Sequence, residues 1–200
     1  MTHHEKPRMP LVAALEVLLP LRGERVIVTT MGAAREWPKL SQHSLDLHYI
    51  PSAMGGAPAL GLGLALAQPG RDVLVLNGDG AMLMNLGSLV TIVASGATNL
   101  TLMVFDNGVY EVTGGQQTAA ATAERRASVD FAGMARAAGF TSVRAFDDLA
   151  AWRRDAALAL QLPGPRFLVL SVQRVADYQL ESAGPLGARL ARFQAALAGK

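Results

Sequence analysis

The tripeptide Gly78-Asp79-Gly80 places a carboxylate between two glycines, directly after the apolar run 72–76. Glycines let the backbone approach a ligand closely, and the N–H groups of a following helix attract phosphate oxygens. Because a carboxylate repels phosphate, we expect a cation between the two, and Mg²⁺ binds in this way, through few protein oxygens plus phosphates. Taken alone, the tripeptide also fits an ordinary Asp-Gly turn.

Asn107 is the second residue whose type and position could contribute to a metal site. It lies 28 residues after Asp79, at the end of the next apolar run, 100–105. One helix and one strand separate the two residues, so both side chains reach one edge of a sheet. An amide oxygen is a hard, neutral ligand suited to Mg²⁺. Asn107-Gly108 also fits a turn, but the pair is more specific than either part.

The elements that position these residues alternate along the chain. Runs typical of strands cover 25–30, 72–76, 100–105, 142–145 and 166–171, and runs typical of helices cover 11–19, 54–67, 84–95, 130–138, 147–160 and 184–198. We interpret 33–48 as a short helix and loop, and 106–128 as a polar loop. The alternation predicts an α/β fold, a mostly parallel sheet with helices on both faces. Ligands of such sheets bind beyond the carboxyl ends of the strands.

The composition indicates one globular domain. The chain has 200 residues, half of them apolar, a net charge of +2 and no cysteine. We expect a core over about 25–175 and a C-terminal helix at 184–198. The absence of cysteine excludes disulfides and thiolate metal sites within the chain. Scattered basic residues and short apolar runs predict no nucleic acid and no membrane span. We expect a cytoplasmic protein.

The segment from Gly78-Asp79-Gly80 to Asp106-Asn107 resembles the thiamine diphosphate (ThDP) binding motif, which starts with Gly-Asp-Gly and ends in Asn-Asn. The resemblance implies a ThDP-binding fold with ThDP and Mg²⁺ as cofactors. It implies metal binding by Asp79, Asn107 and the carbonyl of Val109. Asp106 stands where the family has the first Asn, and its role is open.

A second block, residues 49–56, resembles the segment that holds the cofactor in its bent shape. The resemblance assigns that role to Met54, and it implies that the carbonyl of Ser52 accepts a hydrogen bond from the amino group of the aminopyrimidine. Met54 also fits plain helix packing. The complete set of expected cofactor-binding residues is Gly32, Ser52, Met54, Gly78, Asp79, Gly80, Ala81, Asn107 and Val109.

Residues 106–116 resemble the corresponding loop of phosphonopyruvate and sulfopyruvate decarboxylases, with Gly114-Gly115-Gln116 as the distinctive part. Gln116 is the candidate catalytic residue of this chain, and a generic flexible loop is the alternative. The resemblance implies a split 2-oxo acid decarboxylase acting on a small anionic substrate. A partner chain, of the alpha type, would supply the pyrimidine domain and the Glu that activates the cofactor. The apolar segment 55–63 is a plausible contact with that partner.

Three other functions stay open: a carboligating subunit of the acetolactate synthase type, a non-catalytic ThDP-binding module, and a 2-oxoacid:ferredoxin oxidoreductase subunit. The absence of cysteine argues against the last.

Several polar residues are interpreted as ordinary surface. His3 and His4 fit a disordered terminus. Arg35, Lys39 and His43 fit a solvated face better than a site for an anionic substrate. Glu111 fits a loop charge, and Arg125-Arg126 fits solvent or an interface.

Overall fold

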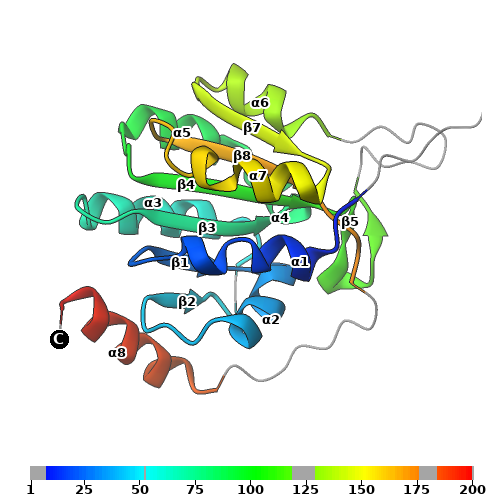
Figure 1. The fold of residues 1–200 in the computed structure, drawn as a ribbon. Coiled ribbons are helices and arrows are strands. Elements are labelled where there is room, and N and C mark those ends of the chain that lie inside the picture. Colours follow the sequence, from blue (N-terminus) through cyan, green and yellow to red (C-terminus); the bar gives the residue numbers. More distant parts are fainter. Residues whose placement is uncertain (1–7, 52, 119–128, 176–183, 200) are drawn as a thin grey trace, which may run out of the picture.

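A computed structural model describes residues 8–51, 53–118, 129–175 and 184–199. Its central sheet has six parallel strands in the order β2-β1-β3-β4-β8-β7 (Figure 1). The strands are β1 (Val26–Thr29), β2 (Asp46–His48), β3 (Val73–Gly78), β4 (Leu100–Asp106), β7 (Ser142–Phe146) and β8 (Arg166–Ser171). A separate antiparallel hairpin joins β5 (Val109–Tyr110) to β6 (Gln116–Gln117) across the 3-10 turn η2 (Glu111–Thr113).

Helices cover both faces of the sheet. They are α1 (Leu11–Glu16), α2 (Met31–Leu40), α3 (Ala57–Ala67), α4 (Asp79–Leu83), α5 (Gly87–Ser95), α6 (Phe131–Ala137), α7 (Leu149–Ala159) and α8 (Leu186–Leu197), with a 3-10 turn, η1, at Leu19–Leu21. α1, α2 and α7 pack on one face, and α3, α5 and α6 pack on the other (Figure 1). The predicted fold class is confirmed.

The central strands show why the fold forms. In β3, Val73 and Val75 enter the core on the α3 side, while Leu74 and Leu76 enter the core on the α1 side. All four side chains are at most 1% exposed. A continuous apolar run is therefore required, as in parallel strands covered on both faces.

Some boundaries differ from the sequence-based expectations. β2 lies inside 33–48, which we expected to be helix and loop. The helix expected from Met54 begins at Ala57, because Gly55 takes a positive φ of 84° in the preceding turn. The tripeptide Gly78-Asp79-Gly80, which also fitted an Asp-Gly turn, contains the start of α4. The helix expected at 84–95 begins at Gly87, and the loop expected at 106–128 contains the β5–β6 hairpin.

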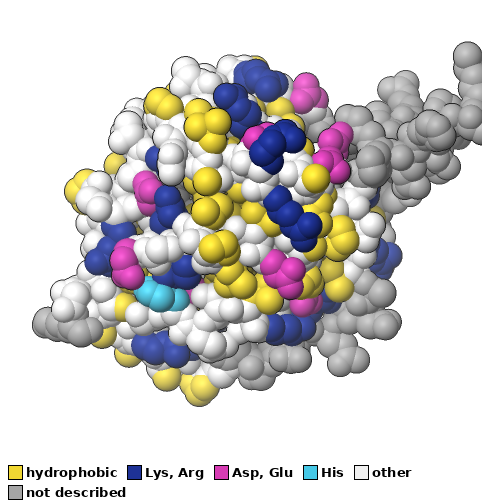
Figure 2. Space-filling view, in the orientation of Figure 1, with side chains coloured by type: hydrophobic (Ala, Val, Ile, Leu, Met, Phe, Trp, Pro, Cys, Tyr) yellow, Lys and Arg dark blue, Asp and Glu magenta, His cyan; other side chains and the backbone are white. Residues whose placement is uncertain are grey.

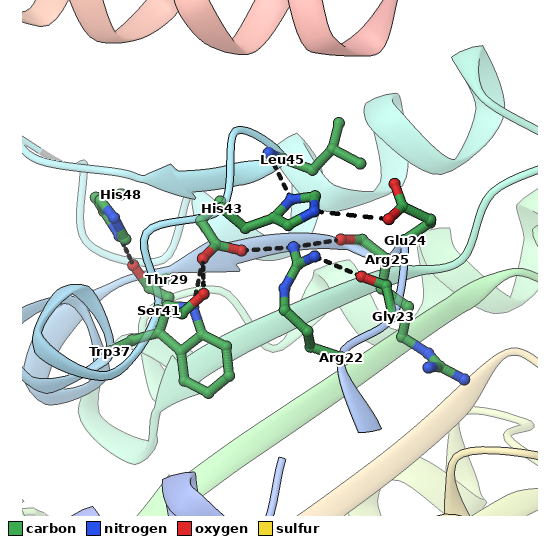
Figure 3. A network of polar contacts seen from close by, with 11 residues as sticks. Arg22, Gly23, Glu24, Arg25, Thr29, Trp37, Ser41, His43, Leu45 and His48 are labelled. Carbon is green, nitrogen blue, oxygen red and sulfur yellow. Dashed lines mark hydrogen bonds and ion pairs between the residues drawn. The ribbon is translucent and has the colours of Figure 1, made fainter. Parts of the chain in front are cut away.

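A buried polar network fixes the edge strand β2 to α2 (Figure 3). The carboxylate of Asp46 is 5% exposed. It accepts hydrogen bonds from Arg22 Nη2 at 2.8 Å, Trp37 Nε1 at 3.1 Å and Ser41 Oγ at 2.5 Å. A buried carboxylate is tolerated when it is paired and hydrogen-bonded in this way. The network lies near the amino end of β2 and connects it to the C-terminal part of α2. It therefore orients α2, whose first residues lie at the carboxyl end of β1.

Charges of both signs are interspersed with apolar side chains on the face that carries α1 and α7 (Figure 2). Within the described ranges, no helix is long and apolar enough to cross a bilayer.

Candidate cofactor site

The strand order reverses direction between β1 and β3, since the chain passes from β1 outward to β2 and returns to β3 on the other side of β1. Such a switch point leaves a crevice beyond the carboxyl ends of the two strands. A pocket occupies this position. Its lining includes eight residues that we expected to bind the cofactor: Gly32, Met54, Gly78, Asp79, Gly80, Ala81, Asn107 and Val109. Ser52, the ninth, lies outside the described residues.

Asp79 is at the centre of this arrangement. The register pairs Gly78 with Phe105, which brings Asp79 beside Asp106 at the ends of β3 and β4. Asp79 Oδ2 accepts the Gly108 N–H at 2.8 Å. Burial, and then the nearby Asp106 carboxylate, raise the pKa of Asp79 to about 7. Two buried carboxylates that face one another favour either a shared proton or a bound cation.

The loop after β4 has a defined geometry. Asn107 Oδ1 accepts the Val109 N–H at 3.0 Å, and Gly108 between them has a φ of 77°. Arg8 Nη1 donates to the Asn107 carbonyl at 2.5 Å. An amide oxygen has two lone pairs, so Asn107 Oδ1 retains capacity for a second partner.

Side chains from the hairpin region lie close against two glycines of the pocket. A Cβ on Gly80 would lie 2.5 Å from Cδ1 of Tyr110, and a Cβ on Gly32 would lie 2.9 Å from Oε2 of Glu111. Real Cβ atoms essentially never approach neighbours closer than 3.0 Å. The β5–η2 segment therefore packs directly over the first turns of α4 and α2, and it forms one wall of the pocket.

Met54 also lines the pocket. It follows the cis peptide Ile50-Pro51 and precedes Gly55. The Gly55 carbonyl accepts a hydrogen bond from Asn85 Nδ2 at 2.9 Å. This contact ties the Met54 turn to the segment between α4 and α5, so the apolar side chain of Met54 is held at the pocket.

Several pocket residues were missed or misjudged from the sequence, and three of them are polar or have an unusual backbone conformation. Glu111, interpreted as a loop charge, is 9% exposed, and its Oε1 accepts the Val175 N–H at 3.1 Å. Met31 lines the pocket with a φ of 55°, an uncommon conformation for a non-glycine residue. Asn77 lines the pocket and is buried, and within the described residues its Oδ1 has no hydrogen-bond partner. Met31 and Asn77 could have been found, because each lies beside an expected cofactor glycine at a strand end.

The candidate catalytic residue Gln116 and three of the polar residues interpreted as ordinary surface do not line the pocket. Gln116 is exposed, and its carboxamide bonds back to Thr113. Arg35 is buried beside Glu36 rather than solvated, Lys39 pairs with Glu36 at 3.2 Å, and His43 Nδ1 accepts the Leu45 N–H. These three residues do not line the pocket. The residues His3, His4 and Arg125-Arg126 lie outside the described ranges.

The donor set fits a magnesium ion that is held together with a diphosphate. No described Lys or Arg forms an ion pair with Asp79 or Asp106. The described residues also contain no cluster of three or more His, Cys, Asp or Glu that could hold a metal alone. A cation here needs amide and backbone oxygens and a ligand's phosphates, which is how Mg²⁺ binds in nucleotide and diphosphate sites.

A parallel sheet with a glycine-lined, acid-bearing pocket at its switch point defines an α/β domain suited to a diphosphate-bearing cofactor. Residues 28–170 match the family described as "Thiamine pyrophosphate enzyme, C-terminal TPP binding domain". The chain belongs to this family, and the resemblance identified from the sequence is confirmed. Its cofactor is thiamine diphosphate.

Relatives with assigned activities include phosphonopyruvate and sulfopyruvate decarboxylases. The chain is 40% identical over 165 residues to a phosphonopyruvate decarboxylase of Streptomyces viridochromogenes, covering 81% of this chain and 39% of that protein. It is 34% identical over 162 residues to the sulfopyruvate decarboxylase subunit beta of Methanothermobacter thermautotrophicus, covering 81% of each. The chain thus spans about two fifths of the first relative and most of the second.

Solved structures show the same fold. Benzoylformate decarboxylase from Polynucleobacter necessarius superposes with a TM-score of 0.68 at 20% identity, covering 90% of this chain and 36% of that one. A putative thiamin diphosphate-dependent enzyme from Mycobacterium smegmatis gives 0.66 at 18% identity, with coverages of 84% and 32%.

Proposed function

We propose that this chain is the diphosphate- and Mg²⁺-binding subunit of a ThDP-dependent 2-oxo acid decarboxylase, and that a partner chain completes the active site. The observation that carries the proposal is the pocket at the β1/β3 switch point. There the buried carboxylate of Asp79, the amide of Asn107 and the apolar side chain of Met54 line one cavity.

Each of these residues has a role in the proposal. Asp79, the Asn107 side chain and the Val109 carbonyl hold Mg²⁺, which neutralises the diphosphate. Backbone N–H groups at the start of α4 meet phosphate oxygens, and Met54 supports the bent cofactor. Bound ThDP supplies the carbanion chemistry, while this chain supplies placement and electrostatics.

The substrate class is proposed from the relatives. Two groups of them are named for phosphonopyruvate and sulfopyruvate. Both names denote 2-oxo acids with a second anionic group. We therefore propose a small 2-oxo acid with a phosphonate or sulfonate tail as the substrate.

The proposed partner would cover an apolar surface on α3 and α5. α3 contains only apolar residues, glycine and proline, yet Leu66 is 56% exposed, and Val90 on α5 is 60% exposed. A helix that is apolar all round is ordinarily buried. Because Met54 lies at the turn before α3, a subunit seated on this surface would lie beside the cofactor pocket. The match to a protein named subunit beta supports a heteromer.

The test is reconstitution. The chain is purified alone and together with a candidate pyrimidine-domain chain. ThDP affinity is measured by calorimetry, and CO₂ release is measured with sulfopyruvate, phosphonopyruvate and pyruvate. For the isolated chain we expect weak ThDP binding and no CO₂ release. After assembly with the partner we expect tight ThDP binding and turnover.

Replacing the partner's activating Glu should abolish turnover and leave assembly intact. Full turnover by the isolated, homogeneous chain contradicts the shared site. An assembled complex that converts 2-oxo acids to acyloin products without free aldehyde would instead favour carboligation.

A further inference from the structure

The outer wall of the pocket is built from two segments far apart in sequence. The β5–β6 hairpin lies beside the stretch that follows β8 (Figure 1). Val172 and Glu111 both line the pocket, and the Val175 N–H donates to Glu111 Oε1 at 3.1 Å. We call residues 173–175 the rim of the site, because they follow the pocket-lining Val172 although they do not line the pocket themselves.

Arg174 is on this rim, and a glycine makes room for it. A Cβ on Gly115 would lie 2.4 Å from Nη2, 2.5 Å from Cζ and 2.6 Å from Nη1 of Arg174. The guanidinium group thus lies across the one face of Gly115 that a side chain would occupy. Gly114 and Gly115 have φ angles of 115° and 79°, so the loop follows a path that favours glycine at both positions.

Toward the residues that the structure describes, the guanidinium of Arg174 has unused donors. Arg174 is exposed, and within the described part of the chain it forms no ion pair with an acid. Glu111, the acid on the same wall, is instead bonded to a backbone N–H. A guanidinium has five N–H donors in a planar fork, and here that fork lies next to Gly115.

A second positive charge lies along the same wall. Met9 pairs with Val172 in a parallel bridge, and Arg8 donates to the Asn107 carbonyl. Like Arg174, Arg8 forms no ion pair with a described acid. The two arginines give this side of the pocket a positive potential that attracts anions.

We propose that Arg174 is the specificity-determining residue that binds the anionic tail of the substrate, a tetrahedral sulfonate or phosphonate, with Gly115 making space for its guanidinium. Two parallel N–H donors match two oxygens of such a group. Arg8 adds to the attraction without touching the tail. The inference rests on the proposed function, because it assumes that the 2-oxo acid end meets the cofactor while the tail points to the rim.

The test uses the assembled holoenzyme and the variants Arg174→Gln, Arg174→Lys and Arg153→Gln. Arg153 is an exposed arginine on α7 and is the matched control for lost charge. Steady-state kinetics are measured with sulfopyruvate, phosphonopyruvate and the tail-less substrate pyruvate. We expect Arg174→Gln to lower the preference for tailed substrates over pyruvate at least about tenfold, through KM rather than kcat. The substrate preference of Arg174→Lys should lie between those of Arg174→Gln and the wild type, and the preference of Arg153→Gln should match the wild type.

A direct binding measurement separates this inference from the proposed function. Sulfoacetate and phosphonoacetate are titrated into each protein by calorimetry, and ThDP affinity is measured in parallel. We expect Arg174→Gln to lose affinity for the probes and to keep ThDP. Tighter binding of one probe would identify the tail as sulfonate or phosphonate.

Two results would overturn the role of Arg174. One is an equal loss for tailed and tail-less substrates, which makes Arg174 a support of the loop. The other is unchanged probe affinity in Arg174→Gln, which places the anion elsewhere. If the wild-type complex binds the probes but decarboxylates no 2-oxo acid, the proposed function fails and the anion site stands.

Discussion

Asp79 combines two properties that conflict in the absence of a cation. It is 2% exposed, and it lies beside a second buried carboxylate, Asp106. A buried charge without a partner is destabilising. The contact with the Gly108 N–H offsets only part of that cost. The site is therefore arranged for a ligand rather than for the stability of the empty chain.

The substitution Asp79→Asn tests this arrangement, because Asn keeps the shape and still accepts the Gly108 N–H. We expect the melting temperature without cofactor to be unchanged or higher, since one of two facing carboxylates is removed. ThDP affinity of the assembled protein in Mg²⁺ should fall at least about a hundredfold, roughly 2.7 kcal/mol. Calorimetry and thermal melts with and without Mg²⁺ and ThDP measure both effects. Unchanged ThDP affinity would show that Asp79 is not a metal ligand.

Met54 is the residue for which packing and function are hardest to separate. We expect Met54→Ala to leave folding and ThDP affinity nearly intact and to lower turnover of the assembled enzyme at least about tenfold, because the bent cofactor loses its support. Met54→Leu keeps the volume and should retain most activity. If Met54→Ala lowers the melting temperature but not the specific activity, Met54 is a packing residue only.

At the scale of elements, α3 packs so closely on β3 that a side chain at one of its glycines would clash, whereas a side chain at another would not. A Cβ on Gly61 would lie 2.1 Å from Cγ2 of Val75, whereas a Cβ on Gly63 would have no atom within 4 Å. Both glycines are within the same helix. They therefore form a matched pair for measuring the helix–sheet contact.

We expect Gly61→Ala to destabilise the chain by about 1–3 kcal/mol, as overpacking of a well-filled core does. Gly63→Ala should be neutral or stabilising by up to about 1 kcal/mol, because alanine favours the helix. Urea unfolding at one pH measures both values. Equal effects of the two substitutions would mean that α3 is not seated on Val75 in solution.

The predictability of the elements depended on how local their signals are. β3 and β4 were predicted because each is a continuous apolar run bounded by turn residues. β2 was missed, since its three residues Asp46–His48 carry a single apolar side chain and pair with β1 through tertiary contacts. α4 was missed because a turn signal, Gly-Asp-Gly, also begins a helix of only five residues.

The site followed the same rule. Asp79 and Asn107 were predictable, because parallel strands bring their carboxyl ends to one edge. The burial of Glu111 was not predictable, because its hydrogen-bond partner Val175 lies 64 residues further along the chain. A polar residue in a glycine-rich loop ordinarily indicates solvent exposure.

At the scale of the whole molecule, α8 closes the sheet at its β2 edge. Arg189 donates to the carbonyls of His48 and Ile50, and Phe193 enters the core. His48 Nδ1 contacts Thr29 Oγ1 at 3.0 Å. Burial lowers the pKa of His48; Asp46 opposes this shift, and Arg189 and Arg192 add to it. The attachment of α8 to the sheet thus involves a histidine that the fold keeps neutral.

A lowered pKa means that the unfolded chain binds more protons, so stability rises with pH in this range. The contribution of His48 to the free energy of unfolding is fully present above its ordinary pKa of 6.5. It is lost as the pH falls through the lower pKa that His48 has in the folded state. We therefore expect the free energy of unfolding to decrease between pH 7.5 and 5.5. His48→Gln, which cannot be protonated, should show a smaller decrease. Identical pH dependences for the two proteins would remove His48 as the cause.

The strand order also determines when the sheet can form during synthesis. Among the strands that the structure describes, β7 pairs with β8 alone, and β8 lies between β4 and β7. A ribosome delivers β7 first, and the start of β8 follows about 20 residues later, which takes roughly 1–4 s. During that delay the nascent chain exposes an unpaired β4 edge and a β7 without a neighbour, a state prone to aggregation. Slow translation of 147–165 would prolong this state, so the rate of synthesis over that stretch should affect the yield of folded protein.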